Sequence, residues 1–221
     1  MHITRLELQT ADLKEQALFY GEILGLDTRI IAGTQVLIRA GETELVFTQA
    51  EKGKHCLYHF AFNIPENQFE AAKQWLAMRV GILANEDGDR TIYSKTWDSH
   101  SLYFKDAAGN ILELIARHDL QNAGHQFEIL AISEIGLATA DVPALVNTLQ
   151  EKTGQLPYKG EGSETFTAVG NSDGLFIVVK QGRIWYPNTG LPAQLLPLQV
   201  NFQADETKMI LSGVPYRIDV L

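Results

Sequence analysis

The stretch "ITRLELQTADL" at residues 3–13 recurs as "ISEIGLATADV" at residues 132–142, 129 positions further along the chain. Five of the eleven positions are identical, and three others exchange similar side chains. In each copy, alternating apolar and polar residues predict a strand, and Asp12 and Asp141 predict the N-cap of a following helix. An internal repeat of this kind indicates a fold assembled from copies of one supersecondary unit.

The unit continues in the same order in each copy. A glycine ends each predicted helix, Gly25 or Gly154, and strand-like runs follow around tight turns. A weaker copy lies between the two, with a strand in "LYHFAFNIPE" at residues 57–66 and a hairpin in "SLYFKDAAGNILELIA" at residues 101–116. The unit is therefore a strand, a helix and about three strands, and it occupies residues 1–50, 56–118 and 130–182.

This tandem βαβββ pattern resembles the vicinal oxygen chelate superfamily, which includes glyoxalase I, bleomycin-resistance proteins and extradiol ring-cleaving dioxygenases. The resemblance is carried by "LQTADLKEQALFYGEILGL" at residues 8–26 and by "SLYFKDAAGNILELIAR" at residues 101–117. It implies an α+β fold in which tandem βαβββ modules pair into curved-sheet cups. We expect a fourth, truncated module to start at residue 197.

The same resemblance implies a division of the chain. We expect residues 1–120 to hold modules one and two, paired around the active cup. Residues 121–128 are expected to be a linker, and residues 129–221 to form a structural or dimerising lobe from module three and the truncated module four.

The resemblance also implies a metal site, because the family takes its ligands from the first and last strands of each module. When "TELVF" and "LELIA" are aligned, Glu44 matches Glu113, and each lies on the last strand of its module. His59 in "LYHFAF" lies on the first strand of module two. The expected metal ligands are therefore Glu44, His59 and Glu113. One imidazole and two carboxylates suit Fe(II), Mn(II), Zn(II) or Ni(II).

Arg5 occupies the remaining ligand position, where metal-dependent members commonly carry histidine or glutamine. A guanidinium has no lone pair for a metal, so an alternative remains open: Arg5 replaces the ion and pairs with Glu44 and Glu113. Either way, Arg5 is expected to bind a substrate anion, together with His100 and Tyr103 as further substrate contacts.

Two residues are expected to act in catalysis, Glu113 and Glu7, which faces the same side of its strand as Arg5. The second half of the chain is expected to be chemically empty. Its equivalent positions are approximately Glu134, Phe176, Gln199 and Asp219.

Composition excludes several classes of protein. The net charge of −9 and the sequence pI of about 5.1, with no basic stripe, argue against nucleic-acid binding. No apolar run approaches the roughly 20 residues of a membrane helix. The N-terminal residues lack a secretion signal, and a single cysteine, Cys56, excludes an internal disulfide framework. We expect a cytoplasmic monomer or homodimer.

Three functions are compatible with this pattern. The first is a glyoxalase- or dioxygenase-like metal-dependent enzyme on a small oxygenated metabolite, acting as an isomerase, lyase, thiol transferase or ring-cleaving dioxygenase. The second is a metal-free, bleomycin-resistance-like module that binds a small molecule, with Arg5 in place of the metal. The third is an interaction protein with a vestigial cup.

Overall fold

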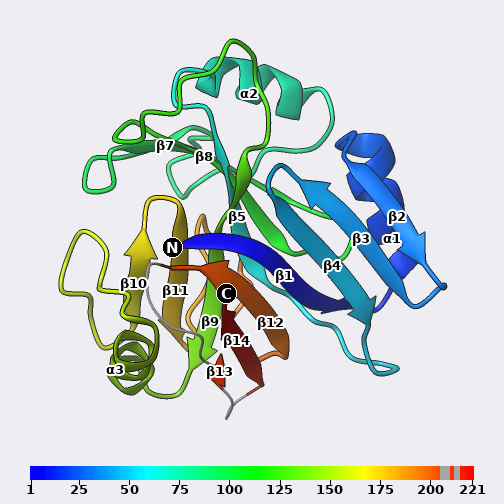
Figure 1. Ribbon diagram of the computed structural model, residues 1–221. Coiled ribbons are helices and arrows are strands. Elements are labelled where there is room, and N and C mark those ends of the chain that lie inside the picture. The colour runs from blue at the N-terminus through cyan, green and yellow to red at the C-terminus, as the bar shows by residue number, and fades with distance from the viewer. Residues whose placement is uncertain (205–209, 212–214) are drawn as a thin grey trace.

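A computed structural model describes residues 1–204, 210–211 and 215–221. Their elements follow one another in the order β1 (His2–Thr10), α1 (Leu13–Leu18), β2 (Asp27–Ile31), β3 (Gln35–Ala40), β4 (Thr43–Gln49), β5 (His59–Ile64), α2 (Phe69–Ala77), β6 (Ile92–Ser94), β7 (Ser99–Lys105), β8 (Ile111–Arg117), β9 (Ala131–Thr139), α3 (Val142–Thr153), β10 (Phe166–Asn171), β11 (Gly174–Lys180), β12 (Leu198–Gln203), β13 (Ile210–Leu211) and β14 (Tyr216–Val220) (Figure 1). A π-helical turn, Phe19–Ile23, extends α1. No helix in these ranges is long and apolar enough to cross a membrane.

The predicted α+β architecture of repeated units is confirmed. The first unit is β1–α1–β2–β3–β4, the second is β5–α2–β6–β7–β8, and the third begins β9–α3. The Asp12 carboxylate accepts hydrogen bonds from the backbone N–H groups of Lys14 and Glu15, and the Asp141 carboxylate accepts one from Ala144. These caps satisfy N–H groups that the first turn of a helix leaves unpaired, so the repeated aspartates fix where each helix begins.

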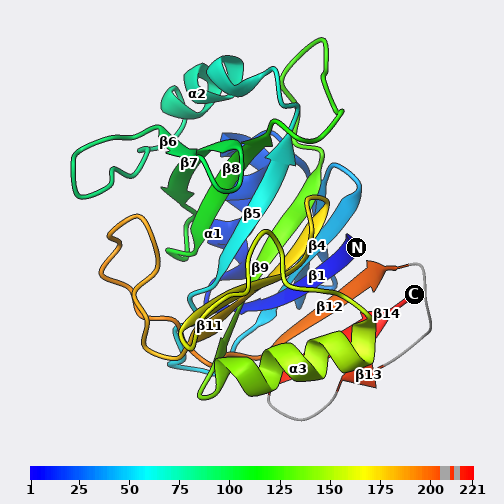
Figure 2. The ribbon, with the colours of Figure 1, turned by 90° about the vertical axis from the view of Figure 1, so that its left-hand side faces the viewer.

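The strands of the described residues form two seven-stranded sheets. Sheet A has the order β13-β14-β12-β1-β4-β3-β2, and sheet B has the order β10-β11-β9-β5-β8-β7-β6. Both sheets curve, and α3 lies along one end of the molecule (Figure 2). In each complete unit the first strand pairs in parallel with the last, β1 with β4 and β5 with β8.

The sheets pair the units differently from the expectation for residues 1–120. Module one pairs with module four through β1 and β12, and module two pairs with module three through β5 and β9. The expected cup between modules one and two must therefore be corrected. The physical reason is that each strand has only two edges. β1 pairs with β4 on one edge and with β12 on the other, and β5 pairs with β8 and β9 in the same way, so β1 and β5 have no edge left for each other.

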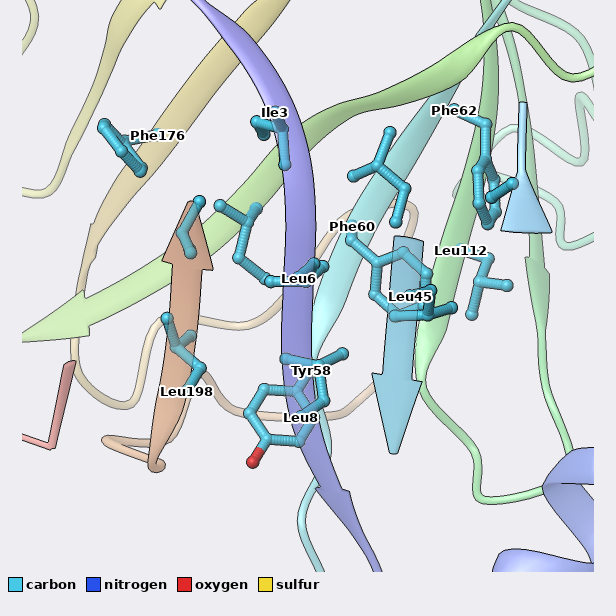
Figure 3. Packing of buried hydrophobic residues seen from close by; sticks show 14 of the residues in the cluster. Ile3, Leu6, Leu8, Leu45, Tyr58, Phe60, Phe62, Leu112, Phe176 and Leu198 are labelled. Atoms are coloured by element: carbon cyan, nitrogen blue, oxygen red, sulfur yellow. The ribbon is translucent and has the colours of Figure 1, made fainter. Parts of the chain in front are cut away.

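The hydrophobic core lies between the two sheets. Figure 3 shows Leu6 of β1 and Phe60 of β5 in one cluster with side chains from both sheets. Because side chains alternate along a strand, the neighbours of these core residues lie on the opposite faces. One such face of sheet A carries Arg5, and the corresponding face of sheet B carries His59.

Two close contacts lock the sheets together. The Thr43 hydroxyl in β4 donates to the Ile3 carbonyl and accepts from the Ile132 N–H of β9, at 2.7 and 2.9 Å. At Gly41 the backbone φ is 59°, and a Cβ there would overlap the Leu130 carbonyl group. The turn before β4 therefore requires glycine, because both its left-handed conformation and this approach exclude a side chain.

Candidate metal centre and its cavity

Three buried side chains with metal-ligating groups meet on sheet B: His59 of β5, Glu113 of β8 and Glu134 of β9. Their strands are neighbours in the order β9-β5-β8, and in each strand the next residue along the chain faces the core. One ligand atom from each residue lies within 4.8 Å of the other two. The alternation of each strand therefore aims an imidazole and two carboxylates at one point.

The orientation of His59 suits metal binding. Its Nδ1 lies 3.1 Å from the Ile111 carbonyl oxygen, an acceptor, so Nδ1 carries the proton and Nε2 keeps a lone pair. Nε2 lies 3.9 Å from a Glu113 oxygen and 4.0 Å from a Glu134 oxygen. These distances are too long for hydrogen bonds. Two ligands held about 2.1 Å from one ion lie roughly 3.0–3.4 Å apart, so a small contraction would fit these donors to a divalent cation.

The ionisation of the cluster follows from its burial. Burial lowers the pKa of His59 to about 4, so the imidazole is neutral at pH 7 and available as a ligand. Burial and the nearby charge of Glu134 raise the pKa of Glu113 to about 8, although Ser101 and Tyr103 donate hydrogen bonds to its carboxylate. Burial also raises the pKa of Glu134, while Arg117 opposes that rise. A cation would relieve the repulsion between these two carboxylates.

Arg117, at the end of β8, already supplies one positive charge to the cluster. The side chain is fully buried and forms an ion pair with Glu134, and its Nε donates to the Asn63 amide oxygen at 3.2 Å. The rings of Trp97 and Tyr158 flank the guanidinium at 5.5 and 5.7 Å. The ion pair uses one Glu134 oxygen, and it is the other oxygen that faces His59. The cluster is therefore partly neutralised and still presents three ligand atoms.

A cavity of about 370 Å³ opens over this cluster. Among the described residues, six aromatic side chains line it: Tyr93, Trp97, Tyr103, Phe166, Trp185 and Tyr186. Two of them come from the segment between β11 and β12, residues 181–197, which we call the strap because it passes from sheet B to sheet A. Backbone hydrogen bonds fold the strap back on itself, with Gly182 donating to Ala193 and Trp185 donating to Leu191.

Trp185 anchors the strap against the cluster. Its ring centroid lies 4.9 Å from that of His59, and the side chain is buried. A Cβ on Gly136 of β9 would lie 2.6 Å from the Trp185 ring, so the absence of a side chain there makes room for the indole. The adjoining Tyr186 ring packs edge-on against Tyr103 at 5.4 Å. The strap therefore forms one wall of the cavity and holds the imidazole in place.

Two donors that line the cavity are buried without an acceptor among the described residues. They are the Ser99 hydroxyl and the Trp185 indole N–H. Arg183, on the strap, is the one lysine or arginine among the described lining side chains. It is exposed, its guanidinium lies 5.1 Å from the Phe166 ring, and it makes no ion pair with a described residue.

The expected ligands are only partly brought together. His59 and Glu113 meet, but Glu44 lies in β4 of sheet A, where it forms an ion pair with Arg5. Arg5 also lies 3.3 Å from Glu7. The expected pairing of Arg5 with Glu44 therefore exists, but it is on the other sheet. Arg5, Glu7 and Glu44 do not line the cavity, because module one does not share a sheet with module two.

The two expected substrate contacts on β7 separate in the same way. Tyr103 lines the cavity. His100 is three residues earlier and projects from the opposite face, where its Nδ1 lies 2.7 Å from His118 Nε2 and its ring packs on Phe69. The period of two along a strand accounts for the difference.

Glu134 is the residue that sequence reasoning assigned to a chemically empty half. It occupies the position of Arg5 in the repeat, 129 residues later, so the repeat did give its location on a first strand. What misled the prediction was the assumption about which units pair. No periodic signal marks the strap, and its aromatic residues were not expected in the site.

Comparisons with known proteins support the fold. A "putative dioxygenase" from Bacillus subtilis subsp. subtilis str. 168 superposes with a TM-score of 0.63 at 13% identity, over 100% of this chain and 85% of that one. A point mutant of glyoxalase I from Zea mays gives a TM-score of 0.61 at 12% identity, over 99% of this chain and 92% of that one. A second point mutant of the same enzyme gives 0.58 at 13% identity, over 99% and 91%.

No family model matches the sequence, and no curated protein matches it. The structural likeness extends over nearly the whole chain, so this protein has the fold of the vicinal oxygen chelate superfamily. At these identities the likeness concerns the fold, which hosts many reactions.

Proposed function

We propose that this protein is a metal-dependent enzyme of the glyoxalase/dioxygenase-like kind that acts on a small oxygenated metabolite. His59, Glu113 and Glu134 would hold the divalent cation, which is Fe, Mn, Zn or Ni by the donor set. The observation that carries the proposal is the buried convergence of three ligand atoms that make no hydrogen bonds to one another. When bound, such a cation polarises a carbonyl, enolate or phenolate oxygen of the substrate.

The chain's own residues have separate tasks in this proposal. Arg117 holds Glu134 in position through the buried ion pair. Tyr103 and Ser101 orient the Glu113 carboxylate by hydrogen bonds. Burial raises the pKa of Glu113 to about 8 in the metal-free protein, and a bound cation would lower it, so the ionised carboxylate would be available to accept a proton from the substrate. The aromatic walls and the strap give the cavity over the cluster a largely aromatic lining.

Glu113 therefore keeps its expected catalytic role as an acid–base group, and the metal set changes from Glu44, His59 and Glu113 to Glu134, His59 and Glu113. Glu7 has no part in this proposal, since it lies on sheet A beside Arg5. A cytoplasmic location and a monomeric or homodimeric state remain predictions.

The test is elemental analysis of protein purified without a chelating tag, before and after incubation with Mn, Fe(II), Ni and Zn. We expect about one bound metal per chain, strongly reduced in H59A and E134Q. The matched control is E44Q, which removes a carboxylate from β4, the strand of sheet A that corresponds to β8 of sheet B. This variant should leave the metal content unchanged. Equal loss in E44Q, or no uptake of any of the four metals by the unmodified chain, would reject the proposal.

A metal-free binding module is the second candidate, and one observation favours it. The Arg117–Glu134 ion pair already places a cation against one carboxylate of the cluster. Arg117, rather than the expected Arg5, would then substitute for the metal. This candidate predicts that a chelator leaves the melting temperature unchanged and that added metals do not raise it. A rise in melting temperature with any of the four metals would count against it.

A further inference from the structure

The geometry points to a small aromatic carboxylate as the ligand of the cavity over His59, Glu113 and Glu134. In this arrangement a planar ring packs among the aromatic walls, and Arg183 of the strap pairs with the anionic group. The inference rests on the proposed function, because it takes this cavity as the substrate site.

The walls favour a flat, apolar ring. The six aromatic side chains come from β6, β7, β10, the strap and the turn before β7, so aromatic surface faces the cavity from several sides. Aromatic pairs favour offset or edge-to-face contacts, and rings in these orientations already surround the space: Tyr186 is edge-on to Tyr103. The volume of about 370 Å³ is more than twice the roughly 150 Å³ of an apolar cavity that binds benzene, which leaves room for substituents.

The expected negative charge of the ligand follows from Arg183, the one lysine or arginine among the described residues that line the cavity. Arg117 is fully buried, paired with Glu134 and absent from the cavity lining. Arg183 lines the cavity, makes no ion pair with any described residue and has its guanidinium beside the Phe166 ring. A guanidinium in this position presents a fork of donors that matches a carboxylate.

Two further donors require an acceptor on the ligand. Ser99 Oγ and Trp185 Nε1 are buried in the cavity wall without a partner among the described residues. A buried donor that loses water and gains no acceptor is unfavourable, so these two groups select a ligand with oxygen acceptors. Because Trp185 also packs against His59, an acceptor that reaches its N–H lies near the metal ligands.

The experiment is a calorimetric titration of small-molecule probes into the full chain, in both its metal-free and its metal-loaded form. The probes are benzoate, its neutral isostere benzamide, the non-aromatic anion cyclohexanecarboxylate, and the cation benzylamine. We expect benzoate to bind at least tenfold more tightly than each of the other three. This order separates the contribution of the ring from that of the charge.

Two substitutions locate the recognition in named residues. R183Q should reduce benzoate affinity to that of benzamide. The matched control, R29Q, removes an arginine at the exposed edge of sheet A, where Arg29 pairs with Asp27, and should change nothing. W185F keeps an aromatic ring but removes the indole N–H, and it should weaken benzoate several-fold while leaving the protein folded, as judged by its melting temperature.

The inference is overturned if benzamide or benzylamine binds as tightly as benzoate, if R183Q behaves like R29Q, or if benzoate shows no saturable binding at millimolar concentration. These outcomes are separate from those of the proposed function. Uptake of one metal per chain without a preference for benzoate would remove the aromatic carboxylate and leave the metal-dependent enzyme. A preference for benzoate without metal uptake would remove the metal-dependent enzyme and leave the aromatic carboxylate as the ligand of the cavity.

Discussion

Replacing Arg117 by methionine is expected to destabilise the metal-free protein by about 3–5 kcal/mol, because it leaves a buried carboxylate without its cation. The side chain is fully buried, and besides the ion pair with Glu134 it donates to Asn63. Methionine is apolar and flexible, so the loss is mainly electrostatic and not a cavity effect. For a chain of 221 residues, each kcal/mol shifts the melting temperature by about 2–4 °C. The expected fall is therefore roughly 6–20 °C.

Urea denaturation and thermal melts of chelator-treated protein measure this loss. Two rescues follow from the same reasoning. Adding E134Q to R117M removes the unpaired buried charge and should restore most of the stability. Lowering the pH should also narrow the gap between R117M and the parent, because burial raises the pKa of Glu134 and the acid form needs no cation.

The control is R29Q, whose arginine pairs with Asp27 on the exposed edge of sheet A. Such surface pairs contribute about 0–1 kcal/mol, so R29Q should melt with the parent. The reasoning is refuted if R117M loses less than R29Q or if E134Q makes R117M still less stable. A divalent metal should stabilise R117M more than the parent, since the ion then supplies the missing charge.

Three further predictions concern other parts of the molecule. Burial raises the pKa of Glu113 in the folded protein to about 8, above that of an exposed glutamate, so ionisation of Glu113 disfavours the folded state. Stability is therefore lost as the pH rises from about 4.5 to 8. Thermal melts from pH 5 to 9 should show that metal-free E113Q becomes more stable than the parent at the alkaline end. G136A should displace the Trp185 ring, which would lie 2.6 Å from the new Cβ, and tryptophan fluorescence should shift to the red while His59 loses its packing partner. G41A should cost several kcal/mol in urea denaturation, because its Cβ would overlap the Leu130 carbonyl group and its φ of 59° disfavours alanine; a near-neutral effect would contradict the close approach of the two sheets.

Much of the fold was predictable because it is local. The repeated aspartates Asp12 and Asp141 cap their helices as expected, and the alternation along β5 and β8 correctly set His59 and Glu113 on one face. These features depend on neighbours within a few residues. A single sequence states them directly.

The pairing of modules was not predictable in the same way. The first strand of each module offers an edge to any other first strand, and the alternation of side chains is equally satisfied by several partners. The structure joins β5 to β9, and that choice brings Glu134 to the site in place of Glu44. The position of the strap was also not predictable from the sequence. Trp185 contacts residues far away along the chain, His59 and Gly136, and no periodic pattern indicates these contacts.

The way the two sheets are divided along the chain has a consequence for how the protein is made. All strands of sheet B lie between residues 59 and 180, whereas sheet A takes its strands from residues 2–49 and 198–220. On the ribosome, β5 and its neighbours can therefore assemble while β12 has not yet been synthesised. The edge of β1 that pairs with β12 stays open for the whole of that interval, and an open strand edge is a site of unwanted pairing with other chains. The edge of β1 is therefore exposed to such pairing until β12 has been synthesised and covers it.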